Sequence, residues 1–526
     1  MGESSRSYAA IVPLLAWLAL VALPGCGSGE AIELLRREDR TPTPAGQAQL
    51  YGVAPEVPIL AEPRTGASRL GTLRLGGSIE RAAEPASTEG CPDGWFAVQP
   101  LGFVCATGAA RLERPPSMAP LAEGPDLSLP LPYRYGRVRR GGAVVYSALP
   151  NLMAQRLAEP DGPGKAPKDR QLGAGSNDVP LDEAGMATGP AVIRPGTPGV
   201  GPDGYRTVGA FFAFTTAFDP PPIGVELTPT VRPPLAELVA QLLPETTTLR
   251  RRSIVPVVAS FDLEGPTGLR AFGLLSDGRF VPLEQLEPAL GTAWHGLDLR
   301  EVGLPVAFTL RSGVRPRRLY GGRSKPLPDE YGWNEGLPLT GRFRTVAGQR
   351  HYLTRDRRWV RHKDLILLHR RHRFPDFAAG VHKWVDVSLA NQYLVAYEGR
   401  KPVYATLISS GRDRLGDPET EPATPQGIFT VTAKHVTADI DGREVERRYQ
   451  LEAIPWVLAI SGGFSISAAP WLRRLGAARG HHNISLAPVD ARWLFHWAHP
   501  RLPDGWHSVL SSEDGVDTTT TVYVHK

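Results

Sequence analysis

The sequence has few cysteines and, after its first residues, no long uncharged apolar run. Only three of its 526 residues are cysteine, at positions 26, 91 and 105. No stretch after residue 23 stays apolar over the roughly 20 residues that a membrane-spanning helix needs. These absences exclude a protein that crosses a membrane several times. We expect the residues after Cys26 to be soluble, and their number implies several domains.

The N-terminus carries the one apolar run of note, YAAIVPLLAWLALVAL at residues 8–23, which ends in LPGC at Cys26. The run is too short to span a membrane, and Gly25 is the small residue that signal processing requires. We therefore predict a lipoprotein signal peptide and lipobox over residues 1–26, with Cys26 lipidated so that the lipid anchors the protein to a membrane. A buried core helix is the alternative. Gly27, where an aspartate would retain a lipoprotein in the inner membrane, favours the outer membrane.

Once Cys26 is set aside, Cys91 and Cys105 remain. The predicted signal peptide would export them to an oxidising compartment. We predict that they form one disulfide. The short loop that it closes would contribute about 3 kcal/mol in the chain-entropy model. Two buried free thiols are the alternative.

Glycine and proline are abundant, with 56 and 51 residues, and this composition favours many short strands over long helices. We therefore predict a mainly β fold class. Between Tyr51 and Cys105, short β-prone runs alternate with turn residues. The run GWFAV at 94–98, followed by GFVC at 102–105, resembles the terminal hairpin of the bacterial SH3-like barrel.

The net charge is +5 and the isoelectric point is near 9.1. Arginine and lysine cluster at residues 315–318, 355–363 and 370–373. Such clusters could face anionic polymers of the cell envelope, and a solvated surface is the alternative. We expect no nucleic-acid partner outside the cytoplasm.

The chain divides by composition. We predict a flexible linker over 27–50 and an SH3-like domain over 51–115. A divergent β-rich region then spans 116–380 and includes a disordered loop rich in glycine and proline at 159–204. The sequence GRFVPLEQL at 278–286 is echoed by RRWVRHKDL at 357–365. The echo predicts two further SH3-like units between Arg134 and His369.

The C-terminal part is the most informative. VHKWVDVSLANQYLVAYEGRKPVYATLISSGR at 381–412 predicts a strand and then a hairpin with Glu398 and Gly399 at its tip. TPQGIFTVTAKH follows at 424–435. In this order the segments resemble the catalytic domain of L,D-transpeptidases, whose sequences run W-I-x-V-x-L-x-x-Q-x-L-x-x-Y-x-x-G into T-P-x-G-x-F. The resemblance implies a β-sandwich domain with a few short helices over 381–515, followed by a tail at 516–526.

In that family a cysteine thiolate attacks the carbonyl of a tetrapeptide stem, a histidine moves the protons, and backbone N–H groups stabilise the oxyanion. The active-site motif of the family is S-H-G-C-x-R, and an H-G pair lies upstream of it on a neighbouring strand. AARGHHNISLAPVDARWLF at 477–495 aligns with this motif without a gap, and the segment from Leu486 to Phe495 matches the framing helix. The family positions fall on Ser467 and Ala468 (upstream H-G), and on Gly480, His481, His482, Asn483 (the cysteine) and Ser485.

No catalytic residue is therefore intact, and activity is uncertain. The Asn483 amide is neutral and its nitrogen is not nucleophilic, so it cannot form the acyl-enzyme. His482 places a side chain where the family has glycine, close to the oxyanion position. We predict a pseudoenzyme that has lost transfer chemistry and needs no cofactor.

Two other chemistries are weighed against this. A serine triad would use Ser467 or Ser485 with His481 and Asp490, although nothing in the spacing imposes the geometry. A metal site would use His481 and His482 with His496 and His499, against the expectation that adjacent histidines point in different directions. Four tryptophans could form a sugar-binding surface, or lie in the core as framing positions do: Trp456, Trp471, Trp493 and Trp497.

The sequence thus predicts a cell-envelope lipoprotein, facing the periplasm, whose partner is peptidoglycan or a cell-wall enzyme. One alternative is an active L,D-transpeptidase-like or hydrolytic enzyme of peptidoglycan that uses a non-cysteine nucleophile or a metal. A further alternative is a structural protein that spaces the layers of the envelope.

Overall fold

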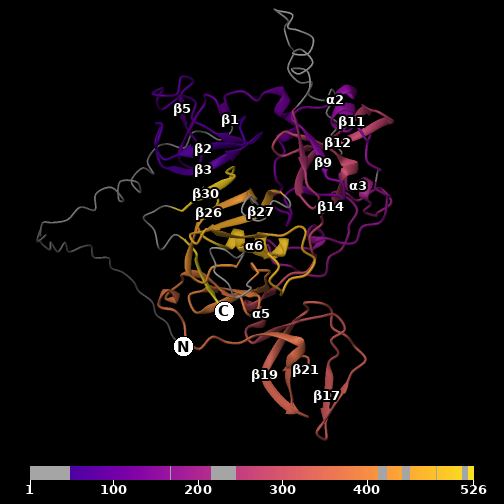
Figure 1. Ribbon diagram of the computed structural model, residues 1–526. Coiled ribbons are helices and arrows are strands. Elements are labelled where there is room, and N and C mark those ends of the chain that lie inside the picture. Colours follow the sequence, from indigo (N-terminus) through magenta and orange to yellow (C-terminus); the bar gives the residue numbers. More distant parts are fainter. Residues whose placement is uncertain are drawn as a thin grey trace, which may run out of the picture. The chain divides into compact units, whose positions relative to one another are not determined.

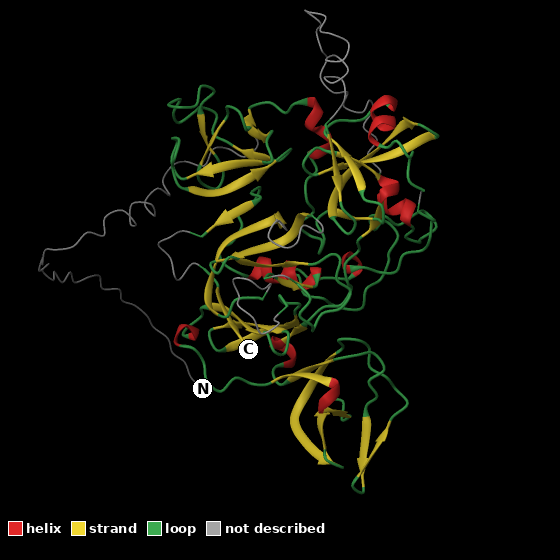
Figure 2. Ribbon diagram, viewed as in Figure 1, coloured by secondary structure: helices red, strands yellow, loops and turns green. Residues whose placement is uncertain are grey.

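The computed structural model describes residues 48–165, 167–214, 245–412, 423–440, 450–480, 482–511 and 519–526 (Figure 1). Strands dominate and helices are short, which confirms the mainly β fold class (Figure 2). No helix among these residues is long and apolar enough to cross a membrane. The signal peptide, Cys26, most of the linker and His481 lie outside the described residues.

Three stretches before the C-terminal domain each contain seven strands, and we name them module A (49–111), module B (134–288) and module C (306–368). Module A comprises β1 (Gln49–Gly52), β2 (Glu56–Leu60), β3 (Arg69–Arg74), β4 (Ser78–Glu80), β5 (Trp95–Ala97), β6 (Phe103–Cys105) and β7 (Ala110–Arg111). Module B comprises β8 (Arg134–Val138), β9 (Ala143–Tyr146), β10 (Thr246–Leu249), β11 (Ile254–Gly265), β12 (Gly268–Leu275), β13 (Phe280–Pro282) and β14 (Leu286–Pro288). Module C comprises β16 (Val306–Thr309), β17 (Arg317–Tyr320), β18 (Arg323–Pro326), β19 (Gly336–Val346), β20 (Gln349–Thr354), β21 (Trp359–Arg361) and β22 (Leu365–Leu368).

The three modules share one pairing scheme. In each, the first strand pairs with the fourth and the last, as β1 does with β4 and β7. The second strand pairs with the third and the sixth, and the fifth pairs with the sixth. The first and last strands of each module therefore lie side by side, and in module C the seven strands form one sheet with β18 and β22 at its ends.

The two echoed sequences take the same structure. In module B, β13 leads through the 3-10 helix η4 (Leu283–Gln285) into β14, and in module C, β21 leads through η5 (His362–Asp364) into β22. The repeat that the echo predicts between Arg134 and His369 is therefore present in the strand pairing of both modules.

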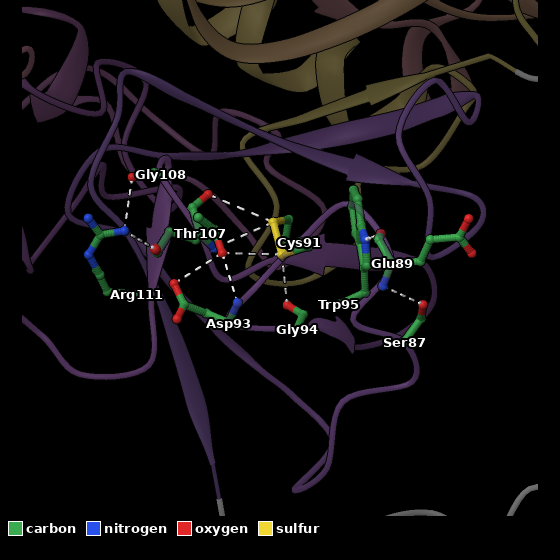
Figure 3. Close-up of a disulfide and its surroundings, with 11 residues drawn as sticks. Ser87, Glu89, Cys91, Asp93, Gly94, Trp95, Thr107, Gly108 and Arg111 are labelled. Carbon is green, nitrogen blue, oxygen red and sulfur yellow. Dashed lines mark hydrogen bonds between the residues drawn. A yellow bond between two sulfur atoms is a disulfide. The ribbon is translucent and has the colours of Figure 1, made fainter.

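Cys91 and Cys105 form a disulfide in module A (Figure 3). Cys91 precedes β5 and Cys105 ends β6, so the bridge closes the loop that joins this hairpin to the rest of the module. Thr107 lies beside the bridge and donates a 3.0 Å hydrogen bond to the Asp93 carboxylate. The Trp95 indole donates to the Glu89 carbonyl over 2.8 Å. The loop is thus fixed by hydrogen bonds as well as by the disulfide.

The segment predicted as a disordered loop, 159–204, is instead held by several buried residues, although many of its other described residues are exposed. It contains the 3-10 helix η3 (Ser176–Asp178), and Asp178 forms a buried ion pair with Arg206. Met186 joins the hydrophobic core of the C-terminal domain. The low apolar periodicity led to the wrong prediction, because a few buried anchors hold an otherwise irregular chain. Short helices lie nearby: η2 (Pro116–Leu121), α2 (Leu152–Ala158) and α3 (Val208–Phe212).

The C-terminal domain contains two sheets that share the long strand β26 (Gly427–Ile440), which pairs with β31 (Thr521–His525) in one sheet and with β27 (Leu451–Ile460) in the other. The hairpin with Glu398 and Gly399 at its tip is present as β24 and β25. The remaining elements are β15 (Leu297–Asp298), α5 (Leu299–Val302), η6 (Asp376–Ala378), β23 (Lys383–Ser388), β24 (Tyr393–Glu398), β25 (Lys401–Leu407), β28 (Phe464–Ala468), β29 (Ile484–Leu486), α6 (Pro488–Trp497) and β30 (Ser508–Leu510).

The helix α6 lies in the core of this domain. Ala491, Leu494 and Phe495 pack in one cluster with apolar side chains from both sheets. Its C-terminal carbonyls are bound by the Lys434 ammonium, which donates to Ala498 over 2.8 Å. Cations at a helix C-terminus also favour the helix dipole. The helix is thereby fixed directly after β29, where the motif residues lie.

The predicted tail at 516–526 is wrong. Residues 521–525 form β31, which pairs in parallel with β23 and antiparallel with β26. The sequence TVYVH alternates between buried and partly buried positions as a sheet strand does. The domain therefore extends beyond residue 515, and its last strand completes a sheet.

Two modules pair with strands of the C-terminal domain. In module A, β3 pairs with β30, and the Thr72 and Ser508 hydroxyls lie 2.7 Å apart. In module B, β11 pairs in parallel with β27 through Ile254 and Leu451. Main-chain pairing of this kind covers strand edges that would otherwise bind other chains.

Candidate functional site

The motif residues line one face of a strand pair. β28 and β29 run in parallel, with Ser467 opposite Ser485 and Ala468 opposite Leu486. On the other side of β29, Ser485 bridges Ser409, with both main-chain hydrogen bonds at 2.9 Å. Ile466, Ala468, Ile484 and Leu486 point into the domain core. Because side chains alternate along a strand, the face away from this core carries a polar floor: Ser409, Ser465, Ser467, Asn483 and Ser485.

Asn483, which the motif predicts at the position of the family's cysteine, is bound to the neighbouring strand. Its Oδ1 accepts hydrogen bonds from the Ser465 N–H over 2.8 Å and from the Ser465 hydroxyl over 3.0 Å. These bonds hold the side chain against β28. The amide therefore acts as a structural acceptor, and it offers no nucleophile to a bound carbonyl.

His482 keeps the backbone that the family's glycine would favour. Its φ is +47°, in the left-handed region that costs a side-chain-bearing residue about 1 kcal/mol. The Thr424 hydroxyl donates a 2.7 Å hydrogen bond to the His482 carbonyl, and Thr424 also accepts from the Gly411 N–H over 2.9 Å. A buried threonine thus fixes the loop at His482.

The serine triad does not assemble around Asp490. This carboxylate is fully buried and accepts from the Tyr404 hydroxyl over 2.7 Å, from the Gly296 N–H over 2.9 Å, and from the Thr406 hydroxyl. Burial raises the pKa of Asp490. Its oxygens are thus used on the core side of α6, whereas Ser467 and Ser485 lie on the opposite face of the strands.

The four histidines of the metal hypothesis are only partly described, because His481 lies outside the described residues. Within that description, no group of three or more His, Cys, Asp or Glu side chains is close enough to hold a metal ion. The His496 ring packs against Trp456, and desolvation lowers the pKa of His496 to about 4. His499 follows α6 and its N–H donates to the Thr520 hydroxyl over 2.8 Å.

The tryptophans divide between core and cavity. Trp456 and Trp493 are buried, and Trp493 stacks between Tyr404 and Trp497. Trp471 differs, because it lines a cavity of about 360 Å³ just beyond the end of β28. Arg170 and Arg473 are exposed in the same lining. This cavity combines an aromatic ring with cations.

Sequence reasoning missed two residues that shape the site. Ser465 supplies both bonds to Asn483, and Thr424 fixes the His482 carbonyl. The strand period was the available signal for Ser465, since it lies two residues before Ser467 and so shares its face. Thr424 opens the T-P-x-G-x-F segment and gave no chemical signal of its own.

The chain was also compared with known protein families and proteins, and the C-terminal domain has matches in both. Residues 382–524 match the L,D-transpeptidase catalytic domain model, YkuD. YciB of Bacillus subtilis (strain 168), whose name places it among the L,D-transpeptidases, is 29% identical over 125 residues, which cover 22% of this chain and 60% of YciB.

Solved structures match at lower sequence identity. An Enterococcus faecium L,D-transpeptidase mutant is 24% identical with a TM-score of 0.20, covering 27% of this chain and 50% of that protein. A Mycobacterium tuberculosis H37Rv L,D-transpeptidase is 19% identical with a TM-score of 0.21, covering 36% and 77%. The chain thus spans about 60% of YciB and about half of the Enterococcus protein. The C-terminal part of this chain, residues 382–524, is thus similar to the L,D-transpeptidase catalytic domain.

Proposed function

We propose that this chain is a cell-envelope protein that binds peptidoglycan through its L,D-transpeptidase domain without performing transfer. The observation that carries the proposal is the pair of hydrogen bonds from Ser465 to Asn483 at the nucleophile position. A carboxamide has no lone pair basic enough to attack an amide carbonyl. A site that keeps its frame and loses its nucleophile is suited to binding alone.

The polar floor supports binding of a neutral, hydrogen-bonding chain. Within this floor the Ser465 and Asn483 side chains are partly exposed, whereas the three serines that lie on adjacent strands are buried: Ser409, Ser467 and Ser485. Hydroxyls both donate and accept, so they can bind peptide and sugar groups without a fixed charge. The cavity lined by Trp471, Arg170 and Arg473 would add an apolar face for a sugar ring and cations for stem-peptide carboxylates.

Modules A, B and C would support the L,D-transpeptidase-like domain and increase the distance over which it can act in the cell envelope. Their shared strand order and the short 3-10 turn before the last strand of modules B and C support our interpretation of them as SH3-like units.

A lipid on Cys26 would anchor the chain to a membrane, with the outer membrane favoured. Cys26→Ser should move the protein from the membrane fraction to the soluble fraction. Equal membrane recovery of both forms would refute the anchor.

Sedimentation with purified sacculi tests the binding. A chain that starts at Gly27 should pellet with sacculi, and Trp471→Ala with Arg473→Ala should lower the bound fraction severalfold. Arg194→Ala, which changes an exposed arginine outside the cavity lining, is the matched control. Recovery of the wild type in the supernatant would count against peptidoglycan and would direct the search to a cell-wall enzyme as the partner.

Incubation with tetrapeptide-stem muropeptides, read by mass spectrometry, tests the absence of transfer. We expect unchanged substrate beside an active family member. Loss of the terminal D-alanine or cross-linked dimers would establish an enzyme. Ser467→Ala and Ser485→Ala would then show whether a hydroxyl of the polar floor is the nucleophile.

A further inference from the structure

Module C is far more basic than the rest of the chain. Residues 306–368 contain 14 Arg and Lys and five Asp and Glu, whereas the whole chain has a net charge of only +5. The positive charge is also unevenly placed within the module. The strands β17, β18, β19 and β20 carry no acidic residue, and seven of their residues are cationic.

Four of the five acidic residues of module C are bound to other arginines, and the fifth, Glu335, accepts a hydrogen bond from the Gly332 N–H. Asp364 pairs with Arg311 and Arg361, and Glu330 pairs with Arg315. Asp329 and Asp356 both pair with Arg358. Among the described residues, six exposed cations of the four strands form no ion pair, and two of them, Arg342 and Arg344, lie on the opposite face of β19 from Phe343. We name the other four the basic hairpin surface: Arg318, Arg323, Lys325 and Arg350.

The β17–β18 hairpin concentrates like charge on one side. Arg318 lies directly opposite Lys325, and Tyr320 lies opposite Arg323. Side chains that are opposite each other, or two residues apart on one strand, share a face, so these four point the same way. Like charges directly across a strand pair destabilise it. An anion between them would remove that repulsion.

The hairpin is held by its other face. Arg317 donates to the Ser324 carbonyl over 2.7 Å, and the Ser324 hydroxyl lies 3.0 Å from His351 Nε2 on β20. Gly321 and Gly322 form the two-residue loop, with φ of 54° and 70°, as a tight hairpin turn requires. The outward cations are therefore presented by a rigid support that does not depend on them. The contact through His351 also joins this hairpin to β19–β20.

Two aromatic side chains stand in water beside these cations. Tyr320 is 86% exposed and Phe343 is 55% exposed. The Arg350 guanidinium lies 4.9 Å from the Phe343 ring centre, so cation and ring form one unit. Aromatic rings flanked by basic residues favour the headgroup region of a bilayer, where the ring meets apolar chains and the cation meets phosphate.

We propose that module C binds the surface of an anionic lipid bilayer through the basic hairpin surface, with Tyr320 and Phe343 entering the headgroup region. The binding is a property of this module and does not depend on the state of the transpeptidase site. A protein held to the membrane at module C would carry its C-terminal domain at a limited height above the lipid.

Co-sedimentation with vesicles tests this. The chain that starts at Gly27 should pellet with phosphatidylglycerol–phosphatidylethanolamine vesicles and remain in solution with phosphatidylcholine vesicles. Each basic residue near an anionic membrane contributes about 1 kcal/mol, so Arg318→Glu, Arg323→Glu and Lys325→Glu together should weaken binding on the order of 100-fold. The matched control changes three exposed cations elsewhere, Arg140→Glu, Lys168→Glu and Arg194→Glu, and should retain binding.

Tyr320→Ser separates a bilayer from a soluble polyanion. It should weaken vesicle binding severalfold at a salt concentration that screens the charges, with Tyr205→Ser as control because that tyrosine is 55% exposed outside module C. Equal binding of wild type and the triple module C variant would overturn the proposal. Wild type that ignores anionic vesicles but is retained on immobilised polyphosphate would also overturn it, and would assign the surface to an anionic polymer.

Discussion

Asn483 Oδ1 accepts two hydrogen bonds from Ser465, one from the backbone N–H at 2.8 Å and one from the hydroxyl at 3.0 Å. The residue at the nucleophile position therefore links the loop before β29 to the strand β28. The residue predicted at the nucleophile position is thus part of the packing, and its replacement should change stability.

Asn483→Ala should destabilise the protein by about 1–3 kcal/mol, because the Ser465 N–H then loses its acceptor in a partly buried position. Urea unfolding measures the change. Ser467→Ala is the matched control, since no hydrogen bond of its hydroxyl is described, and it should be close to neutral. Equal stability of Asn483→Ala and wild type would show that water replaces the lost bonds at no cost.

Asn483→Cys alone should form no acyl-enzyme with a tetrapeptide-stem muropeptide. The new thiol would lie beside Ser465 and Ser467, neither of which can take its proton at neutral pH. Intact-protein mass spectrometry reads the adduct. Adding Ser467→His places an imidazole on the same face of β28 and should raise the thiolate fraction, measured by the rate of alkylation against pH. If the Asn483→Cys variant is acylated, a side chain near position 483 already acts as the base that removes the thiol proton.

Much of this could be predicted from the sequence, for identifiable physical reasons. Short strands between turn residues fixed the fold class, and the hairpin around Glu398 and Gly399 is local enough to be predicted from its pattern. The register of β28 against β29 is not local. It brings Ser465 to Asn483, and no single-strand pattern contains that contact.

Two errors share a cause. The segment 159–204 has little periodicity, yet a buried ion pair and Met186 fix it, and residues 521–525 form a strand only because β23 and β26 offer edges. In both places the structure depends on contacts with residues that are distant in sequence. The local sequence pattern of the segment does not reveal such contacts.

Acid should weaken the protein partly through His507. Its N–H donates to the Thr72 carbonyl in module A over 2.7 Å, and its ring Nε2 lies 3.0 Å from the Thr437 hydroxyl on β26. Desolvation, with Arg74 nearby, lowers the pKa of His507 to about 4. The unfolded chain, with an ordinary histidine pKa near 6.5, then binds more protons between these values, so stability falls as pH falls from about 6.5 to about 4.

His507→Phe removes this proton uptake. Urea unfolding at pH 7 and pH 4.5 should show a loss of stability on acidification that is about 1–3 kcal/mol smaller for the variant than for wild type. Other titrating groups act in both proteins and cancel in the comparison. An identical loss in the two proteins would show that the pKa of His507 in the folded protein is close to its value in the unfolded chain.

The ion pair between Asp178 and Arg206 should account for the order of the segment 159–204. Arg206 donates two hydrogen bonds to the Asp178 carboxylate, at 2.6 and 2.8 Å, and both side chains are at most 3% exposed. Asp178→Ala leaves a buried guanidinium without its partner, which costs about 3–5 kcal/mol. Limited proteolysis should then cut this segment at a lower protease concentration than in wild type.

Replacing both partners distinguishes the loss of a bond from the burial of a lone charge. Asp178→Ala with Arg206→Met removes the charge as well, and apolar replacement of a buried pair is often close to neutral, so the double variant should recover much of the stability lost in Asp178→Ala. The exposed pair of Glu62 and Arg64 is the matched control, and Glu62→Ala should leave unfolding and proteolysis unchanged. If Asp178→Ala resists protease as wild type does, the segment is held by Met186 and its neighbours in the domain core, and the ion pair contributes little.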